Sequence, residues 1–133
     1  MLQKKAIRII SNSNFRDASA PIFYQLKILP IFKVFHLNCL KFLYKCLNEN
    51  RFPFIKNRLM NVNSSHDHAT RFRSHIVPPF ERLEVCKKAY LCKSIHLWNN
   101  LNAEMKESKS LFNFKNKVKH FLVEEMKPVT LRS

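Results

Sequence analysis

The chain of 133 residues contains no glycine. At an average usage of roughly 7%, a chain of this length would carry about nine. Primed hairpin turns and phosphate-cradling loops depend on glycine, because they need positive φ angles or a close approach of the backbone. The absence of glycine therefore disfavours both a hairpin-rich sheet and a glycine-loop nucleotide site. We expect a mostly α fold with little or no sheet.

Length and apolar content fit one folding unit that spans residues 1–133. Hydrophobic residues make up 46% of the chain, and its 12 phenylalanines are spread along it, which is enough for a core of ordinary size. No internal repeat or linker divides the sequence. We expect a small helical domain of about five amphipathic helices with a long central loop.

Hydrophobic periodicity and helix-start signals place the helices. We expect them over residues 2–10, from a cap at Asp17 or Ser19 to Lys27, over residues 31–47, over residues 97–105, and after a cap at Ser108 or Ser110. Residues 54–60 add one turn, residues 61–71 form a polar loop, and residues 75–80 are extended. Residues 83–91 fit a strand or a helix.

Three of these helices show a division between apolar and polar sides. In residues 2–10 we expect Leu2, Ala6, Ile9 and Ile10 to face the core, opposite Lys4, Lys5 and Arg8. In residues 31–47 the expected core side holds Ile31, Phe32, Phe35, His36, Cys39, Leu40, Phe42, Leu43, Cys46 and Leu47, opposite Lys33, Asn38, Lys41 and Lys45. In the last helix Leu111, Phe114, Val118, Phe121 and Leu122 should face inward.

The chain is strongly basic, with 24 Lys and Arg against 9 Asp and Glu, which gives a net charge of +15. A charge this large repels itself unless a polyanion shares it, so nucleic acid is the first partner to consider and an anionic membrane surface the second. No run of about 18 uncharged apolar residues is present, which excludes a transmembrane span. We expect RNA or DNA as the partner and no membrane.

The expected nucleic-acid-binding residues lie on the basic sides of two helices and in the polar loop. They are Lys4, Lys5, Arg8, Lys33, Lys41, Lys45, His66, His68 and Arg71. Lysines opposite an apolar stripe point outward toward phosphates, and an arginine beside imidazole donors suits the same contact. Local hydrogen bonds that fix the path of the chain are the alternative role for the loop residues. Trp98 is either a core anchor or a base-stacking residue.

Catalytic chemistry is poorly supported. Polymerases and metal nucleases hold Mg²⁺ ions roughly 3.5–4 Å apart between clustered carboxylates, whereas the only aspartates here are Asp17 and Asp67. We expect no catalytic residue and no cofactor in this chain. His36, Cys39, His66, His68, Cys86, Cys92 and His96 could supply zinc ligands, but no CxxC pair is present. The cysteines are better interpreted as reduced and intracellular, with Cys39 and Cys46 as small core residues.

Six short motifs follow one another in a recognisable order. They are LQKKAIRII (2–10), APIFYQLKILPI (20–31), FLYKCLN (42–48), HDHATR (66–71), LWNNL (97–101) and SLFNFKNKVKHFL (110–122). Their order resembles the region after the reverse transcriptase core of jockey-like and related non-LTR (LINE-type) retrotransposons, over nearly the whole chain. Members of that family usually have Gly-Pro just before their Trp-Asn, where this chain has Ser94 and Ile95.

The resemblance implies a non-catalytic C-terminal fragment of an RNA-directed DNA polymerase, a segment that joins or follows the polymerase thumb. The catalytic Asp pair, its Mg²⁺ and the endonuclease would then belong to the upstream part of the parent protein, and the upstream core would be a second partner. Nuclear and cytoplasmic locations are expected on this basis.

Two other interpretations remain open. The chain could be a stand-alone basic helical module that binds nucleic acid without an enzymatic role. It could also be an unrelated organellar or membrane-surface protein, since residues 1–16 are basic, lack acids and resemble a mitochondrial presequence. A first helix with a basic outer side explains the same residues.

Overall fold

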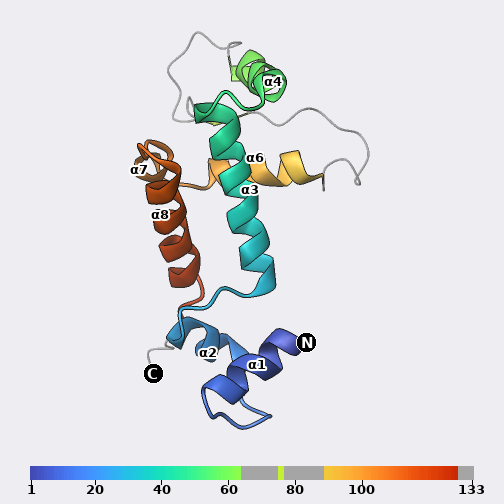
Figure 1. Ribbon diagram of the computed structural model, residues 1–133, viewed down its shortest axis with the longest axis vertical. Helices are drawn as coiled ribbons and strands as arrows, with labels where there is room; N and C mark the ends of the chain where they lie inside the picture. The colour runs from blue at the N-terminus through green and yellow to red at the C-terminus, as the bar shows by residue number, and fades with distance from the viewer. Residues whose placement is uncertain (64–74, 77–88, 129–133) are drawn as a thin grey trace.

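The computed structural model describes residues 1–63, 75–76 and 89–128, and over this part of the chain it contains seven helices and no strand (Figure 1). The mostly helical fold class is thus confirmed, with two more helices than we expected. The helices are α1 (Leu2–Ile10), α2 (Ser19–Gln25), α3 (Ile31–Asn48), α4 (Pro53–Asn63), α6 (Tyr90–Asn99), α7 (Ala103–Lys106) and α8 (Leu111–Glu124).

Helix α3 is the centre of the molecule. Helix α8 runs alongside it in the opposite direction, and α6 crosses it (Figure 1). Helices α1 and α2 pack on one another at the end of the molecule where α3 begins, while α4 lies at the other end. None of the helices in the described ranges is long and apolar enough to cross a membrane.

Two helices end in a left-handed turn made without glycine. Asn12 after α1 has a φ of 53°, and Lys27 after α2 has a φ of 54°. Each turn closes with two backbone hydrogen bonds. After α1, Ser13 N donates to Arg8 O at 2.9 Å and Asn12 N to Ile9 O at 3.1 Å. After α2, Ile28 N donates to Phe23 O at 3.0 Å and Lys27 N to Tyr24 O at 3.1 Å. This is the Schellman pattern, in which glycine is usual. Asparagine tolerates the left-handed region, whereas lysine adopts it at a steric cost.

The capping of α8 was predicted correctly, but the capping of α2 was not. The Ser110 hydroxyl accepts a hydrogen bond from Asn113 N at 3.2 Å at the start of α8. Helix α2 has Ala18 as its N-cap residue and no side-chain cap. Asp17 is not available because its carboxylate instead accepts from Asn14 N at 2.8 Å. The αL turn at Lys27 ends α2 at Gln25, two residues before the expected end.

Two further predicted elements differ from expectation in their boundaries. The helix predicted over residues 97–105 begins earlier, at Tyr90, and is divided, because α6 ends at Asn99 and α7 begins only at Ala103. Leu101 N donates to Trp98 O at 3.0 Å and turns the chain between them. Helix α4 continues to Asn63, so the first residues of the predicted 61–71 loop are helical. Of the segment predicted to be extended, only His75 and Ile76 are described, and neither is helical.

The main core lies between α3, α6 and α8 and is built around aromatic rings. Tyr44 stacks on Phe114 with ring centroids 4.5 Å apart, and Trp98 lies 5.6 Å from Phe114. Trp98 is buried, which confirms it as a core anchor. Cys39 and Cys46 are completely buried, as expected of small core residues. On α8, the expected Phe114, Val118 and Leu122 are buried, and Val123 joins them.

A smaller apolar cluster of Ile7, Ile22 and Phe23 joins α1 to α2. Its composition shows that the predicted core side of α1 was wrong: Leu2, Ile9 and Ile10 are exposed, and Ile7 is the residue that α1 buries. The physical reason is that α2 is the main packing partner of α1, so this contact selects the buried side.

The core side of α3 was predicted in part: Cys39, Leu40, Leu43 and Cys46 are buried as expected, but the buried side is rotated. Leu37 and Tyr44, which were not predicted to face inward, are buried, whereas Ile31, Phe32 and Phe35 are exposed. Packing against both α6 and α8 determines which side of α3 is buried. A helical wheel of α3 alone cannot show where those two helices lie.

Candidate nucleic-acid interface

The predicted cations of α1 lie on its solvent side. Lys4 and Lys5 are exposed. Arg8 is half-buried because its Nε donates a hydrogen bond to Asp17 O at 3.0 Å and its guanidinium lies 5.8 Å from the centroid of the Phe15 ring. Lys4 and Lys5 can therefore approach a phosphate without losing an intramolecular contact shown in the described chain, whereas Arg8 also anchors the turn after α1.

Lys33 does not belong to the outward basic side that was predicted for α3. Its Nζ forms an ion pair with the Glu125 carboxylate just after α8, and its side chain is only 15% exposed. The ion pair joins the start of α3 to the end of α8. Because its charge is already compensated, Lys33 is a poor phosphate ligand, and we remove it from the candidate surface.

Lys41 and Lys45 lie one helical turn apart on α3 and are half-buried. At 1.5 Å per residue they lie about 15 and 21 Å along α3 from Ile31, its first residue, and α1 lies next to that end of α3. The structure thus places the predicted helix cations in two separate groups. His66, His68 and Arg71 lie outside the described residues, so their predicted role stays a prediction.

Helix α8 adds cations that were not among the predicted nucleic-acid-binding residues. Lys115 and Lys119 are exposed, and Phe112, three residues before Lys115, is exposed too. The spacing of four residues between the two lysines puts them on one side of the helix. That spacing is present in the sequence. Both lysines, however, lie next to the apolar side of the helix, so they do not stand out as a separate basic side.

Ion pairs distinguish these lysines from their neighbours. In the described part of the chain, Lys33 pairs with Glu125, Arg51 with Glu49 at 3.0 Å, and Lys117 with Glu104 at 3.6 Å. Lys115 and Lys119 take part in none of these three pairs. Lys117 on the same helix therefore offers a natural comparison for them.

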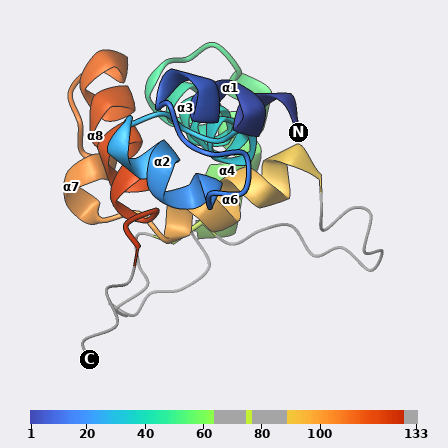
Figure 2. The ribbon, with the colours of Figure 1, turned by 90° about the horizontal axis from the view of Figure 1, so that it is seen from below.

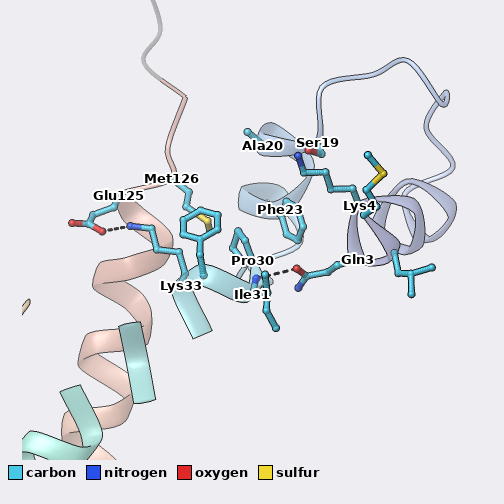
Figure 3. A pocket seen from close by; sticks show the side chains of 13 residues that line it. Gln3, Lys4, Ser19, Ala20, Phe23, Pro30, Ile31, Lys33, Glu125 and Met126 are labelled. Atoms are coloured by element: carbon cyan, nitrogen blue, oxygen red, sulfur yellow. Dashed lines mark hydrogen bonds and ion pairs between the residues drawn. The ribbon is translucent and has the colours of Figure 1, made fainter. Parts of the chain in front are cut away.

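A groove of about 920 Å³ opens where α1, α2 and the start of α3 meet the end of α8 (Figure 3). Gln3 holds one wall in place: its Nε2 donates to Leu29 O, and its Oε1 accepts from Ile31 N, both at 3.0 Å. The lining is mostly apolar and includes Leu2, Phe23 and Phe32. It has the chemistry of a hydrophobic contact surface.

Burial and nearby charge perturb a few titratable groups. The pKa of His36 is lowered by burial and by the positive charges of Lys93 and Lys33, against a smaller opposing effect of Glu125. Burial also lowers the pKa of Lys106 and raises the pKa of the Cys46 thiol. Among the described residues, no group of three or more His, Cys, Asp or Glu side chains is placed to hold a metal ion.

No protein-family model, curated protein or solved structure matches this chain.

Proposed function

We propose that this chain is a non-catalytic C-terminal segment of an RNA-directed DNA polymerase of the non-LTR retrotransposon type, and that it binds the backbone of RNA or of an RNA–DNA duplex. The observation that carries the binding proposal is the set of exposed lysines on α1 and α8, namely Lys4, Lys5, Lys115 and Lys119. The order of the six sequence motifs supports the assignment to a reverse transcriptase.

We expect binding to the phosphate backbone because the candidate cations are lysines on solvent-exposed sides of helices. A lysine ammonium is a compact, strongly hydrated point charge on a flexible stem, without the rigid planar fork of arginine. Lysines on solvated helix sides neutralise phosphates and release counterions, and the resulting affinity depends little on base sequence. Lys41 and Lys45, half-buried on α3, form a separate group of candidate cations on a third helix.

A catalytic role within this chain is not part of the proposal. The chain has only two aspartates, Asp17 and Asp67, fifty positions apart in the sequence. Phosphoryl transfer needs carboxylates that hold metal ions at close range. In the parent protein the polymerase chemistry would reside upstream, and this segment would hold template or product.

Single lysine substitutions on α8 test the binding proposal. Lys115→Gln and Lys119→Gln each remove one charge from an exposed position, so each should lower the salt slope for binding an RNA–DNA duplex by about 0.9. Lys117→Gln is the matched control, because it makes the same change on the same helix at a lysine already paired with Glu104. Fluorescence anisotropy with a labelled duplex measures all three.

A smaller effect of Lys117→Gln than of the other two substitutions supports the assignment of the α8 surface. Equal effects of all three would indicate that only the net charge matters, and would contradict this surface as the site of contact. Duplexes of unrelated sequence should bind within a few-fold of one another, since lysine contacts to phosphates carry no sequence information.

A further inference from the structure

The outer side of α1 carries large apolar side chains that the rest of the described chain leaves uncovered. Leu2 is 84% exposed, Ile9 80% and Ile10 65%. Their spacing of seven and eight residues puts them on one side of the helix. Phe15, in the turn that follows, is 74% exposed. A group of exposed apolar side chains of this kind on a small protein marks a site of contact with another molecule or a membrane.

Cations are interleaved with these apolar side chains. Lys5, Arg8, Ile9 and Phe15 line one shallow cleft together with Ser13. The Arg8 guanidinium lies over the Phe15 ring, 5.8 Å from its centroid. We call this set the α1 surface: Leu2, Ile9, Ile10 and Phe15, with Lys5 and Arg8. A helix with exposed aliphatic side chains beside lysine and arginine has the features of one that lies in the plane of a membrane interface.

We propose that the α1 surface binds peripherally to the anionic face of a lipid bilayer. The aliphatic side chains would enter the boundary between headgroups and acyl chains, and Lys5 and Arg8 would contact the anionic headgroups. A nucleic acid would leave Leu2, Ile9 and Ile10 in water, because aliphatic side chains offer neither a stacking face nor a charge. From the sequence we expected no membrane partner; the exposure of this side of α1 is the observation that changes that expectation.

The position of α1 fits contact with a flat surface. The helix lies at one end of the molecule, and the view from below shows it in front of α3 (Figures 1 and 2). Leu2 also lines the groove in Figure 3 together with Ile31 and Phe32. Ile31 and Phe32 are themselves exposed, so the apolar surface continues from α1 to the first turn of α3.

Charge decides between the candidate occupants of this surface. A second copy of the chain, packed on the same surface, would bring Lys5 and Arg8 close to the same two residues of its partner. Like charges at such an interface repel one another, and each chain already carries a net charge of +15. An anionic bilayer offers both negative charge for Lys5 and Arg8 and an apolar interior for the aliphatic side chains.

Vesicle binding by the full chain tests the proposal. Cosedimentation is measured with vesicles of phosphatidylcholine mixed with phosphatidylserine, and with vesicles of phosphatidylcholine alone. The wild-type chain should bind the mixed vesicles more strongly. A Leu2→Gln/Ile9→Gln double variant keeps every charge but should lose at least about tenfold in partitioning, because two large apolar side chains no longer enter the bilayer. Phe112→Gln on α8, also at an exposed apolar residue, is the matched control and should bind like the wild type.

Three measurements could overturn the proposal. Equal partitioning of the double variant and the wild type would show adsorption by net charge alone. A dimer in analytical ultracentrifugation that the double variant converts to a monomer would assign the α1 surface to contact between copies. Loss of oligonucleotide binding in the double variant, with its helical circular dichroism unchanged, would assign the surface to nucleic acid. Under the proposal, the double variant binds oligonucleotides as the wild type does, so this test is independent of the proposed function.

Discussion

The hydroxyl group of Tyr44 donates a buried hydrogen bond to the carbonyl oxygen of Ser108 at 2.7 Å, between residues 64 positions apart in the sequence. It joins the C-terminal part of α3 to the turn between α7 and α8, and the same tyrosine ring stacks on Phe114 of α8. Tyr44 therefore fixes both the position of α8 on α3 and the turn that leads into it.

Tyr44→Phe should destabilise the fold by about 1–3 kcal/mol, because it leaves the buried Ser108 carbonyl without its partner while keeping the aromatic stack. The free energy of unfolding from urea denaturation measures this. Tyr24→Phe is a suitable control, since the described residues provide the half-buried Tyr24 hydroxyl with no hydrogen bond. An equal loss in both variants would contradict the role assigned to the Tyr44 hydrogen bond.

Trp98→Ala should cost roughly 3–5 kcal/mol of stability, the range typical of large aromatic truncations in a core. Trp98 is only 4% exposed and lies against Phe114, so its removal leaves a cavity that both α6 and α8 border. Phe112→Ala at an exposed position on α8 should change the stability by less than about 0.5 kcal/mol. A Trp98→Ala chain that unfolds at the wild-type urea concentration would contradict the description of this core.

Stability should decrease as the pH falls below neutrality, in part because of His36. Burial, Lys93 and Lys33 lower the pKa of its folded-state imidazole below the model-peptide value of 6.5. The unfolded chain then binds the proton more readily, so the stabilising contribution is complete above pH 6.5 and is lost as the pH falls through the lower pKa of the folded state. His36→Gln should reduce this pH dependence of the melting temperature. An identical pH profile in His36→Gln and wild type would count against this effect.

Much of the fold could be predicted from the sequence because its signals are local. Pro30 and the apolar spacing after it place α3, and the Ser110 hydroxyl caps α8 as its position suggested. The burial of Trp98 follows from its size and apolar neighbours. The missing glycines correctly disfavoured a hairpin-rich sheet, although Lys27 shows that a left-handed turn can still form without glycine.

The candidate surface was harder to predict, because it depends on contacts between distant residues. Lys33 appeared to be an outward cation, but Glu125, far along the chain, pairs with it. The exposure of this side of α1 within the described part of the chain could not be foreseen either. A helical wheel shows which side of a helix is apolar, but it does not show whether a partner covers that side. Ile7 faces α2 and takes the buried position instead of Leu2 or Ile9.

The salt dependence of binding to an RNA–DNA duplex tests the central claim most directly. If the chain contacts phosphates through lysines on α1, α3 and α8, a plot of log affinity against log salt concentration should be linear. Its slope should be about −3 or steeper, which corresponds to at least three or four contacts at roughly 0.9 each. An affinity that does not change with salt, or no binding even at low salt, would contradict the proposal that this basic helical chain binds a nucleic-acid backbone.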